Sequence, residues 1–297
     1  MSEQLETIEE DVISFDGTRL AARRLGEGDA TPLLIINAVG TSMSVWHRAI
    51  VDIVRERPVI LWDLRGLNYS ELPRSDRIDP PAHVEDAVAV AEHFDAPEVA
   101  VASWSSGTRI ALELAATYPE RTRSLTLVNG GYGHPMRRLR FFEFASLLPL
   151  GAGLTKYAAG FLEGPFRSLT RRPEFAGLVR QSGVVGATAD VGGLVEMAHE
   201  VSDCDLRQLL ATSEAVVGDA APRLLDRVEA QTLLIAGGRD QLTSMRMMQK
   251  MADRIPGARL EVFEEATHYL PFEFAPRLSD VLRKFLAETE PLEPGPD

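Results

Sequence analysis

The sequence predicts a doubly wound α/β fold, in which helices cover both faces of a mostly parallel sheet and a helical segment is inserted late in the chain. Short apolar runs typical of parallel strands recur along the chain. Segments with apolar residues at helical spacing alternate with these runs. The alternation stops after residue 129 and resumes at residue 232. These observations together indicate one α/β core that carries one insertion.

The first two strands are expected to form an antiparallel pair. Residues 6–15 alternate between apolar and polar side chains, and Asp16-Gly17 is a strong hairpin signal before "RLAARRLG" (19–26). The later strands are short apolar runs, at 32–37, 58–63, 98–103, 124–129, 232–238 and 259–264. Such runs indicate strands that are buried on both faces of the sheet.

Helices are expected between these strands. The segment "VEDAVAVAEHF" (84–94) has apolar residues at helical spacing, and prolines at 80, 81 and 97 bracket it. The segment "GTRIALELAATYP" (107–119) ends in a proline, and "RLSDVLRKFLAE" (277–288) supplies the last helix. Residues 1–130 and 229–288 are therefore predicted to be the two parts of the core. Residues 131–228 are predicted to form a helical cap, and residues 289–297 a disordered tail.

The composition favours a globular protein without a nucleic-acid partner. With 31 Lys and Arg against 44 Asp and Glu, the formal net charge is −13, which argues against a nucleic-acid partner. No apolar run approaches the length of a membrane helix, so we expect no membrane partner and a cytoplasmic location. Cys204 is the only cysteine and lies between two carboxylates, which favours an inert thiol over a nucleophile.

The segment "VASWSSGTRI" (101–110) places three serines where a buried strand meets a helix. A serine nucleophile at such a junction sits in a strained turn and needs small residues two positions before and after it. Only Ser105 meets this requirement, with Ser103 and Gly107 on its two sides. The alternative is structural, because serine often caps a helix at such a junction.

Two further side chains have the positions that a serine nucleophile requires. Asp240 follows one late strand and His268 follows the next, so the chain order is Ser, Asp, His. Each residue alone has a structural alternative, as a turn residue or a buried histidine. His47 and His134 remain candidates for lining a pocket, but neither is expected to be the base.

An attacked carbonyl also needs hydrogen-bond donors for its developing negative charge. The loop "NAVGTSMSVW" (37–46) follows the first parallel strand and offers the backbone N–H of Val39. The backbone N–H of Ser106, at a helix N-terminus, is the expected second donor. Gly40 serves either a turn or the site.

The chain resembles the α/β-hydrolase-fold proteins across nearly its whole length. The motifs that carry this resemblance are "NAVGTSMSVW", "DLRGLNYS", "SWSSG", "GGRDQLTS" and "THYLPFE". The resemblance implies that Ser105, Asp240 and His268 form a catalytic triad. The sequence departs from the family pattern at Ser103, where a glycine is usual, and at Asn68, which replaces another glycine and suits a left-handed backbone. The loop at 37–46 is also similar to that of the 3-oxoadipate enol-lactonase group.

The expected site binds a small substrate of apolar or mixed character and uses neither a cofactor nor a metal ion. Its substrate-binding residues are expected to be Trp104, Gly40, Phe141 and Phe144. Arginines in "MRRLR" and "RSLTRR" either bind a carboxylate or form a solvated helix face. The sequence leaves formation of a homo-oligomer open.

The leading functional hypothesis is a serine hydrolase that cleaves a carboxylic ester or lactone through an acyl-enzyme. Two alternatives stay open. The same triad supports C–C bond hydrolysis, perhydrolysis and lyase chemistry on this fold. A ligand-binding protein without efficient turnover would also fit the altered "SWSSG" turn.

Overall fold

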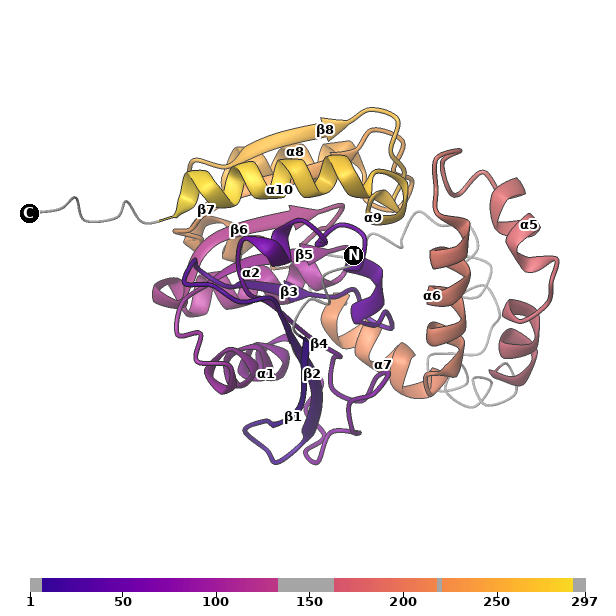
Figure 1. Ribbon diagram of the computed structural model, residues 1–297, viewed down its shortest axis with the longest axis horizontal. Coiled ribbons are helices and arrows are strands. Elements are labelled where there is room, and N and C mark those ends of the chain that lie inside the picture. The colour runs from indigo at the N-terminus through magenta and orange to yellow at the C-terminus, as the bar shows by residue number, and fades with distance from the viewer. Residues whose placement is uncertain (1–6, 133–162, 218–220, 291–297) are drawn as a thin grey trace, which may run out of the picture.

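A computed structural model describes residues 7–132, 163–217 and 221–290 of the chain (Figure 1). Phe141, Phe144 and His134 lie outside these ranges, so the expectations for them stay predictions. Among the described residues, no helix is both long and apolar enough to cross a membrane.

The core is an eight-stranded sheet with the strand order β1-β2-β4-β3-β5-β6-β7-β8. The strands are β1 (Thr7–Ile13), β2 (Arg19–Leu25), β3 (Leu33–Ile36), β4 (Val59–Trp62), β5 (Val99–Trp104), β6 (Thr122–Val128), β7 (Gln231–Gly237) and β8 (Arg259–Phe263). The β1–β2 and β2–β4 pairs are antiparallel, and all the other pairs are parallel. The predicted hairpin and parallel sheet are therefore confirmed.

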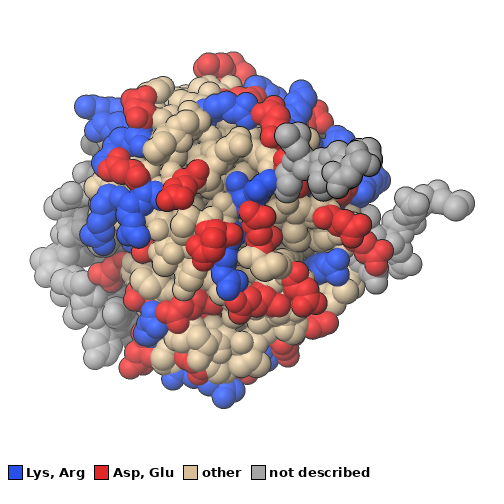
Figure 2. Space-filling view, turned by 90° about the vertical axis from the view of Figure 1, so that its left-hand side faces the viewer, with Lys and Arg blue, Asp and Glu red and all other residues tan. Residues whose placement is uncertain are grey.

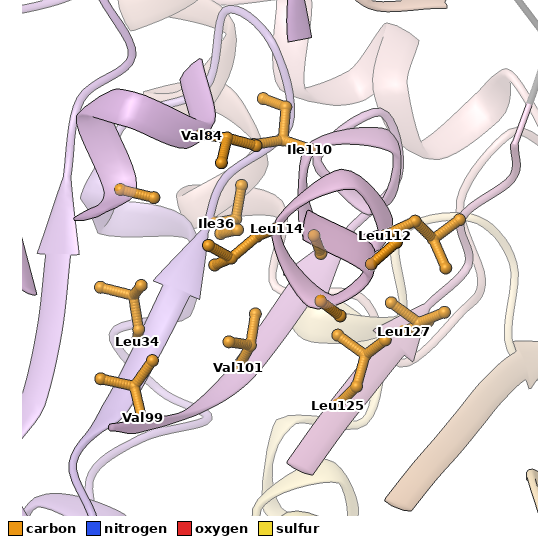
Figure 3. Close-up of a cluster of buried hydrophobic side chains, with 14 of the residues drawn as sticks. Leu34, Ile36, Val84, Val99, Val101, Ile110, Leu112, Leu114, Leu125 and Leu127 are labelled. Atoms are coloured by element: carbon orange, nitrogen blue, oxygen red, sulfur yellow. The ribbon is translucent and has the colours of Figure 1, made fainter. Parts of the chain in front are cut away.

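Helices cover both faces of the sheet. Alternate residues of the central strands point to opposite faces, so that Leu34 and Val101 pack with helix α2 (Gly107–Thr117), as Figure 3 shows. Helices α1 (Pro80–His93) and α8 (Met245–Arg254) contribute to the same apolar cluster. Helix α10 (Ala275–Thr289) packs on the other face. This doubly wound arrangement explains why the central strands read as continuous apolar runs.

Two of the predicted helix and tail boundaries were wrong. Helix α1 begins at Pro80 rather than at 84, because Asp79 caps it by accepting the N–H of Ala82 at 3.3 Å and proline is tolerated in a first turn. The tail was predicted to begin at 289, but α10 includes Thr289. Glu290 is also held, since its carboxylate forms an ion pair with Arg57.

Between β6 and β7, within the segment predicted to be a cap, residues 163–170 are helical and three further α-helices follow them. They are α5 (Phe175–Gln181), α6 (Val191–Asp203) and α7 (Leu206–Val217), and they lie to one side of the sheet in Figure 1. The short helix that follows, Pro222–Arg227, packs against α2 instead. Arg227 also donates to the carbonyl of Ala116 at 3.1 Å, which places this end of the predicted cap on the core.

A buried ion pair fixes the loop that follows β4. The Arg65 side chain is fully buried, and its Nε lies 2.7 Å from the equally buried Asp86 carboxylate on α1. A second carboxylate, that of Asp16, accepts from Arg65 Nη1 at 3.1 Å. His83 lies in the same region, and burial lowers its pKa to about 3. His83 is therefore part of the core.

The surface carries charges of both signs. On the face shown in Figure 2, acidic and basic side chains are interspersed with uncharged ones. Ion pairs between exposed side chains, such as that between Arg254 and Asp226, individually contribute little to stability.

Candidate active site

Ser105 lies in the turn between β5 and α2. Its backbone φ angle is +55°, in the left-handed region that a residue with a side chain adopts only at a cost. The N–H of Ser105 donates to the carbonyl of Val128 on the neighbouring strand at 3.0 Å. This turn is the strained strand-to-helix geometry that exposes a nucleophile at the end of a sheet.

The residues that flank Ser105 explain how strand and helix pass so closely. A Cβ atom at Gly107 would lie 2.6 Å from the carbonyl oxygens of both Ile36 and Asn37. Ser103 is fully buried, and its Oγ lies 3.3 Å from Thr108 Oγ1. The serine that replaces the usual glycine at 103 is therefore accommodated by a hydrogen bond.

The contact at Gly107 makes a stability prediction. We expect Gly107→Ala to lower the free energy of unfolding by about 2 kcal/mol or more, because the backbone carbonyls of Ile36 and Asn37 cannot give way easily. Chemical denaturation measures the change. Gly177→Ala is the matched control, because no atom lies near that position in α5, and it should have no effect or stabilise by up to about 1 kcal/mol. Equal stability of the two variants would contradict the prediction.

A chain of hydrogen bonds joins Ser105, His268 and Asp240. His268 Nε2 lies 2.8 Å from Ser105 Oγ, and His268 Nδ1 lies 2.8 Å from Asp240 Oδ2. The other oxygen of Asp240 accepts the N–H groups of Leu242 and Thr243 at 2.7 and 2.8 Å. The carboxylate is thus held in place and favours the tautomer with the proton on Nδ1, which leaves Nε2 free to accept the proton of Ser105.

Trp104 packs against His268 and holds its backbone. Its side chain is 2% exposed, its Nε1 donates to the His268 carbonyl at 3.0 Å, and its ring centroid lies 5.6 Å from that of the imidazole. These contacts give Trp104 a positioning role. The substrate contact that the sequence suggested for Trp104 stays a prediction.

Asn129 is a positioning residue that the sequence analysis missed. It follows β6 with a φ angle of +46°, and its Nδ2 donates to the carbonyls of Thr267 and His268 at 2.9 and 3.1 Å. Its Oδ1 accepts the N–H of Gly237 at 2.7 Å, at the end of β7. Asn129 therefore ties the histidine loop to the strand that precedes Asp240. An asparagine directly after a buried strand was the available signal.

Glu273 is a second residue that the sequence analysis missed. It ends the short helix α9 (Leu270–Glu273), and its buried carboxylate accepts the N–H and Oγ1 of Thr267 at 2.7 and 2.6 Å. The same carboxylate accepts the N–H of Gly186, in the insertion, at 2.6 Å. Asp190 N–H also donates to the carbonyl of Phe272 at 2.9 Å. Glu273 thus joins the insertion to the residue that precedes His268.

The structure also brings together the two expected donors to an oxyanion. Val39 and Ser106 meet where the loop after β3 approaches the start of α2, and Val39 N–H donates to Ser106 Oγ at 2.8 Å. Gly40 has a φ angle of +87° in the turn closed by Thr41 N–H and the Ala38 carbonyl. Leu209 of α7 lies where a Gly40 side chain would be, so the insertion packs directly on this loop.

Two acidic residues face each other across the insertion and the core. Burial raises the pKa of Asp63 to about 7, and the charge of Glu200 on α6 raises it further, against N–H donors from Tyr69 and Met43. Glu200 in turn accepts from Ser44 Oγ at 3.0 Å. Burial also raises the pKa of the nearby Cys204 thiol, which agrees with an inert cysteine.

The raised pKa of Asp63 predicts a pH-dependent stability. The folded protein holds a proton on Asp63 up to about pH 7, whereas the unfolded chain loses it near the ordinary value of 3.8. Protonation of Asp63 therefore adds to the free energy of unfolding. This stabilisation is fully present below pH 3.8 and is lost as the pH rises through about 7. We expect Asp63→Asn to remove a decrease on the order of a few kcal/mol between pH 5 and 8, measured by denaturation. Parallel pH profiles for wild type and variant would contradict this.

Within the described ranges, no group of His, Cys, Asp and Glu side chains is arranged to hold a metal ion. An imidazole and, through it, a carboxylate are joined to the Ser105 hydroxyl, and this is the arrangement that nucleophilic catalysis requires.

Comparison with known proteins identifies the family. A model of the alpha/beta hydrolase fold matches residues 31–275. The chain belongs to the α/β hydrolase fold family. This match spans every strand from β3 to β8 and all three residues of the Ser105, His268 and Asp240 chain.

Relatives within the α/β hydrolase fold family have several activities. The chain is 27% identical over 276 residues to 2-hydroxymuconate semialdehyde hydrolase of Pseudomonas sp. (strain CF600), which covers 89% of each protein. It is 29% identical over 233 residues to pimeloyl-[acyl-carrier protein] methyl ester esterase of Neisseria meningitidis serogroup B (strain H44/76), covering 77% of this chain and 82% of the relative. The enol-lactonase from Burkholderia xenovorans LB400 superposes with a TM-score of 0.72 at 19% identity, covering 94% and 100% of the two chains, and so shares the fold.

Proposed function

We propose that the protein hydrolyses a carboxylic ester or a lactone, with Ser105 as nucleophile, His268 as base and Asp240 as the residue that orients the imidazole. The observation that carries the proposal is the chain of two 2.8 Å hydrogen bonds from Asp240 through His268 to a serine in a left-handed turn. A helix cap or a structural histidine would require neither this alignment nor the strained backbone.

The reaction proceeds in two halves on this geometry. His268 Nε2 takes the proton of Ser105 Oγ as this oxygen bonds to the substrate carbonyl carbon, and the imidazolium is stabilised by Asp240. The tetrahedral intermediate collapses when His268 returns the proton to the departing alcohol oxygen, which leaves an acyl group on Ser105. A water molecule then gives a proton to His268 and attacks the acyl carbon. His268 returns this proton to Ser105 Oγ as the bond between Oγ and the acyl carbon breaks, which releases the acid and regenerates Ser105.

A second candidate is hydrolysis of a C–C bond next to a carbonyl. The specific observation in its favour is the 27% identity, over 89% of the chain, to 2-hydroxymuconate semialdehyde hydrolase. The esterase relative matches less of the chain than this hydrolase does, at slightly higher identity, and it supports the hypothesis of ester hydrolysis. Ester hydrolysis and C–C bond hydrolysis would both use Ser105, His268 and Asp240. The two reactions differ in the leaving group, which is an oxygen in the first and a carbon in the second.

The test combines labelling with a substrate panel. Intact mass after treatment with a fluorophosphonate should show one adduct on the wild type and none on Ser105→Ala. We expect hydrolysis of short and medium p-nitrophenyl esters and of simple lactones. Turnover of 2-hydroxymuconate semialdehyde without ester hydrolysis would favour the second candidate. Absence of both labelling and turnover would overturn the proposal and favour a ligand-binding protein.

A further inference from the structure

The hydroxyl group of Ser106 makes a contact that an oxyanion site built from backbone N–H groups alone does not require. It accepts the N–H of Val39 at 2.8 Å, so this N–H is engaged by a side chain within the site. The Ser106 residue also precedes α2, where backbone N–H groups have no acceptor within the helix. Oγ is separated from the Ser106 nitrogen only by Cα and Cβ. The Val39 N–H and the Ser106 hydroxyl therefore meet at the residue that directly follows Ser105.

The hydroxyl of Ser106 is not used to stabilise the helix. Serine at a helix start normally accepts an N–H of the first turn, but Ser106 makes no such capping bond to α2. It instead reaches the loop after β3, across 67 positions of the sequence. A purely structural explanation of its orientation as a helix cap is thereby excluded.

The hydroxyl still has a proton to donate. A serine oxygen can accept one hydrogen bond and donate another, and its donor strengthens when its oxygen accepts from a neighbour. Within the part of the chain that the structure describes, Ser106 Oγ donates to no acceptor. Val39 N–H thus polarises a hydroxyl whose own proton remains available next to the nucleophile.

We propose that the Ser106 hydroxyl is a direct donor to the oxyanion, together with the Ser106 backbone N–H, and that Val39 acts through it by polarising the hydroxyl. This inference rests on the proposed function, since it concerns the carbonyl oxygen that Ser105 would attack. It assigns Ser106 a catalytic side chain and makes Val39 a positioning residue in the geometry observed. The opposite role is a hydroxyl that fills the oxyanion position and must be displaced by substrate.

Ser106→Ala and Ser106→Thr separate these roles. Loss of one oxyanion donor typically lowers kcat by about 10²- to 10³-fold, and we expect Ser106→Ala to fall in that range with little change in KM. Ser106→Thr keeps a hydroxyl on the same carbon and should recover most of the lost rate.

Inhibition by a trifluoromethyl ketone distinguishes an oxyanion donor from a residue with a purely structural role. Such a ketone adds to an activated serine and forms a stable oxyanion, so its inhibition constant should rise in Ser106→Ala by the same factor as kcat/KM falls. Activity of Ser106→Ala within threefold of wild type, or above it, would overturn the inference. So would an inhibition constant that does not change. A wild type that neither reacts with fluorophosphonate nor binds the ketone would instead contradict the proposed function itself.

Discussion

Replacing Ser105 with alanine is expected to lower kcat by roughly 10⁴-fold or more for any substrate that the wild type turns over well. The substitution removes the oxygen that lies 2.8 Å from His268 Nε2, and so removes the covalent route. Steady-state kinetics on the best ester from the panel would measure it. Residual activity within tenfold of wild type would show that another group is the nucleophile.

Ser103→Ala is the matched control for this prediction. Ser103 lies two residues before Ser105, is fully buried, and has Thr108 Oγ1 as its hydrogen-bond partner. Its hydroxyl makes no contact with His268 among the described interactions. We expect Ser103→Ala to retain activity and to be labelled by fluorophosphonate, so a general effect of altering the turn would be recognised.

Replacing Asp86 with alanine is expected to lower the free energy of unfolding by about 3 to 5 kcal/mol. Arg65 is fully buried and makes two hydrogen bonds to Asp86, so removal of this carboxylate leaves the buried guanidinium with only part of its charge compensated. Asp16 partners a different nitrogen of Arg65 and cannot replace both contacts. Urea denaturation with a fitted slope measures the loss.

Asp226→Ala is the matched control for Asp86→Ala. Asp226 also makes a two-pronged contact with an arginine, Arg254, but both side chains are exposed. Solvent screens such pairs, so its removal should cost at most about 1 kcal/mol. Equal losses in the two variants would show that burial does not set the strength of the Arg65 pair.

Most of the fold was predictable because parallel strands buried on both faces have a distinctive sequence. The site was predictable for a related reason: the carboxyl ends of parallel strands meet at one edge, so residues that follow β5, β7 and β8 converge. The structure brings Ser105, Asp240 and His268 together at this edge. The requirement for small neighbours also singled out Ser105 among three serines, and Gly107 shows the contact behind that requirement.

The features that the sequence did not reveal depend on the direction of single side chains. Asn129 and Glu273 hold the histidine loop through side-chain contacts to backbone groups more than a hundred residues away or across a turn. Neither residue has a spacing that announces such a contact. Asn68 is the contrasting case: asparagine tolerates a left-handed backbone, and the observed φ of +51° confirms that expectation.

The double attachment of Glu273 limits how the insertion can be exchanged between relatives. One carboxylate oxygen holds both the Thr267 hydroxyl, beside His268, and the N–H of Gly186. A side chain at 186 would begin 3.2 Å from that oxygen. A grafted insertion that alters the chain path at 186 would therefore disturb the support of His268 even if the helices of that insertion were transplanted intact. Chimeras should therefore keep the native residues from Gly186 to Asp190, which contact Glu273 and Phe272, and should take foreign sequence only outside this stretch.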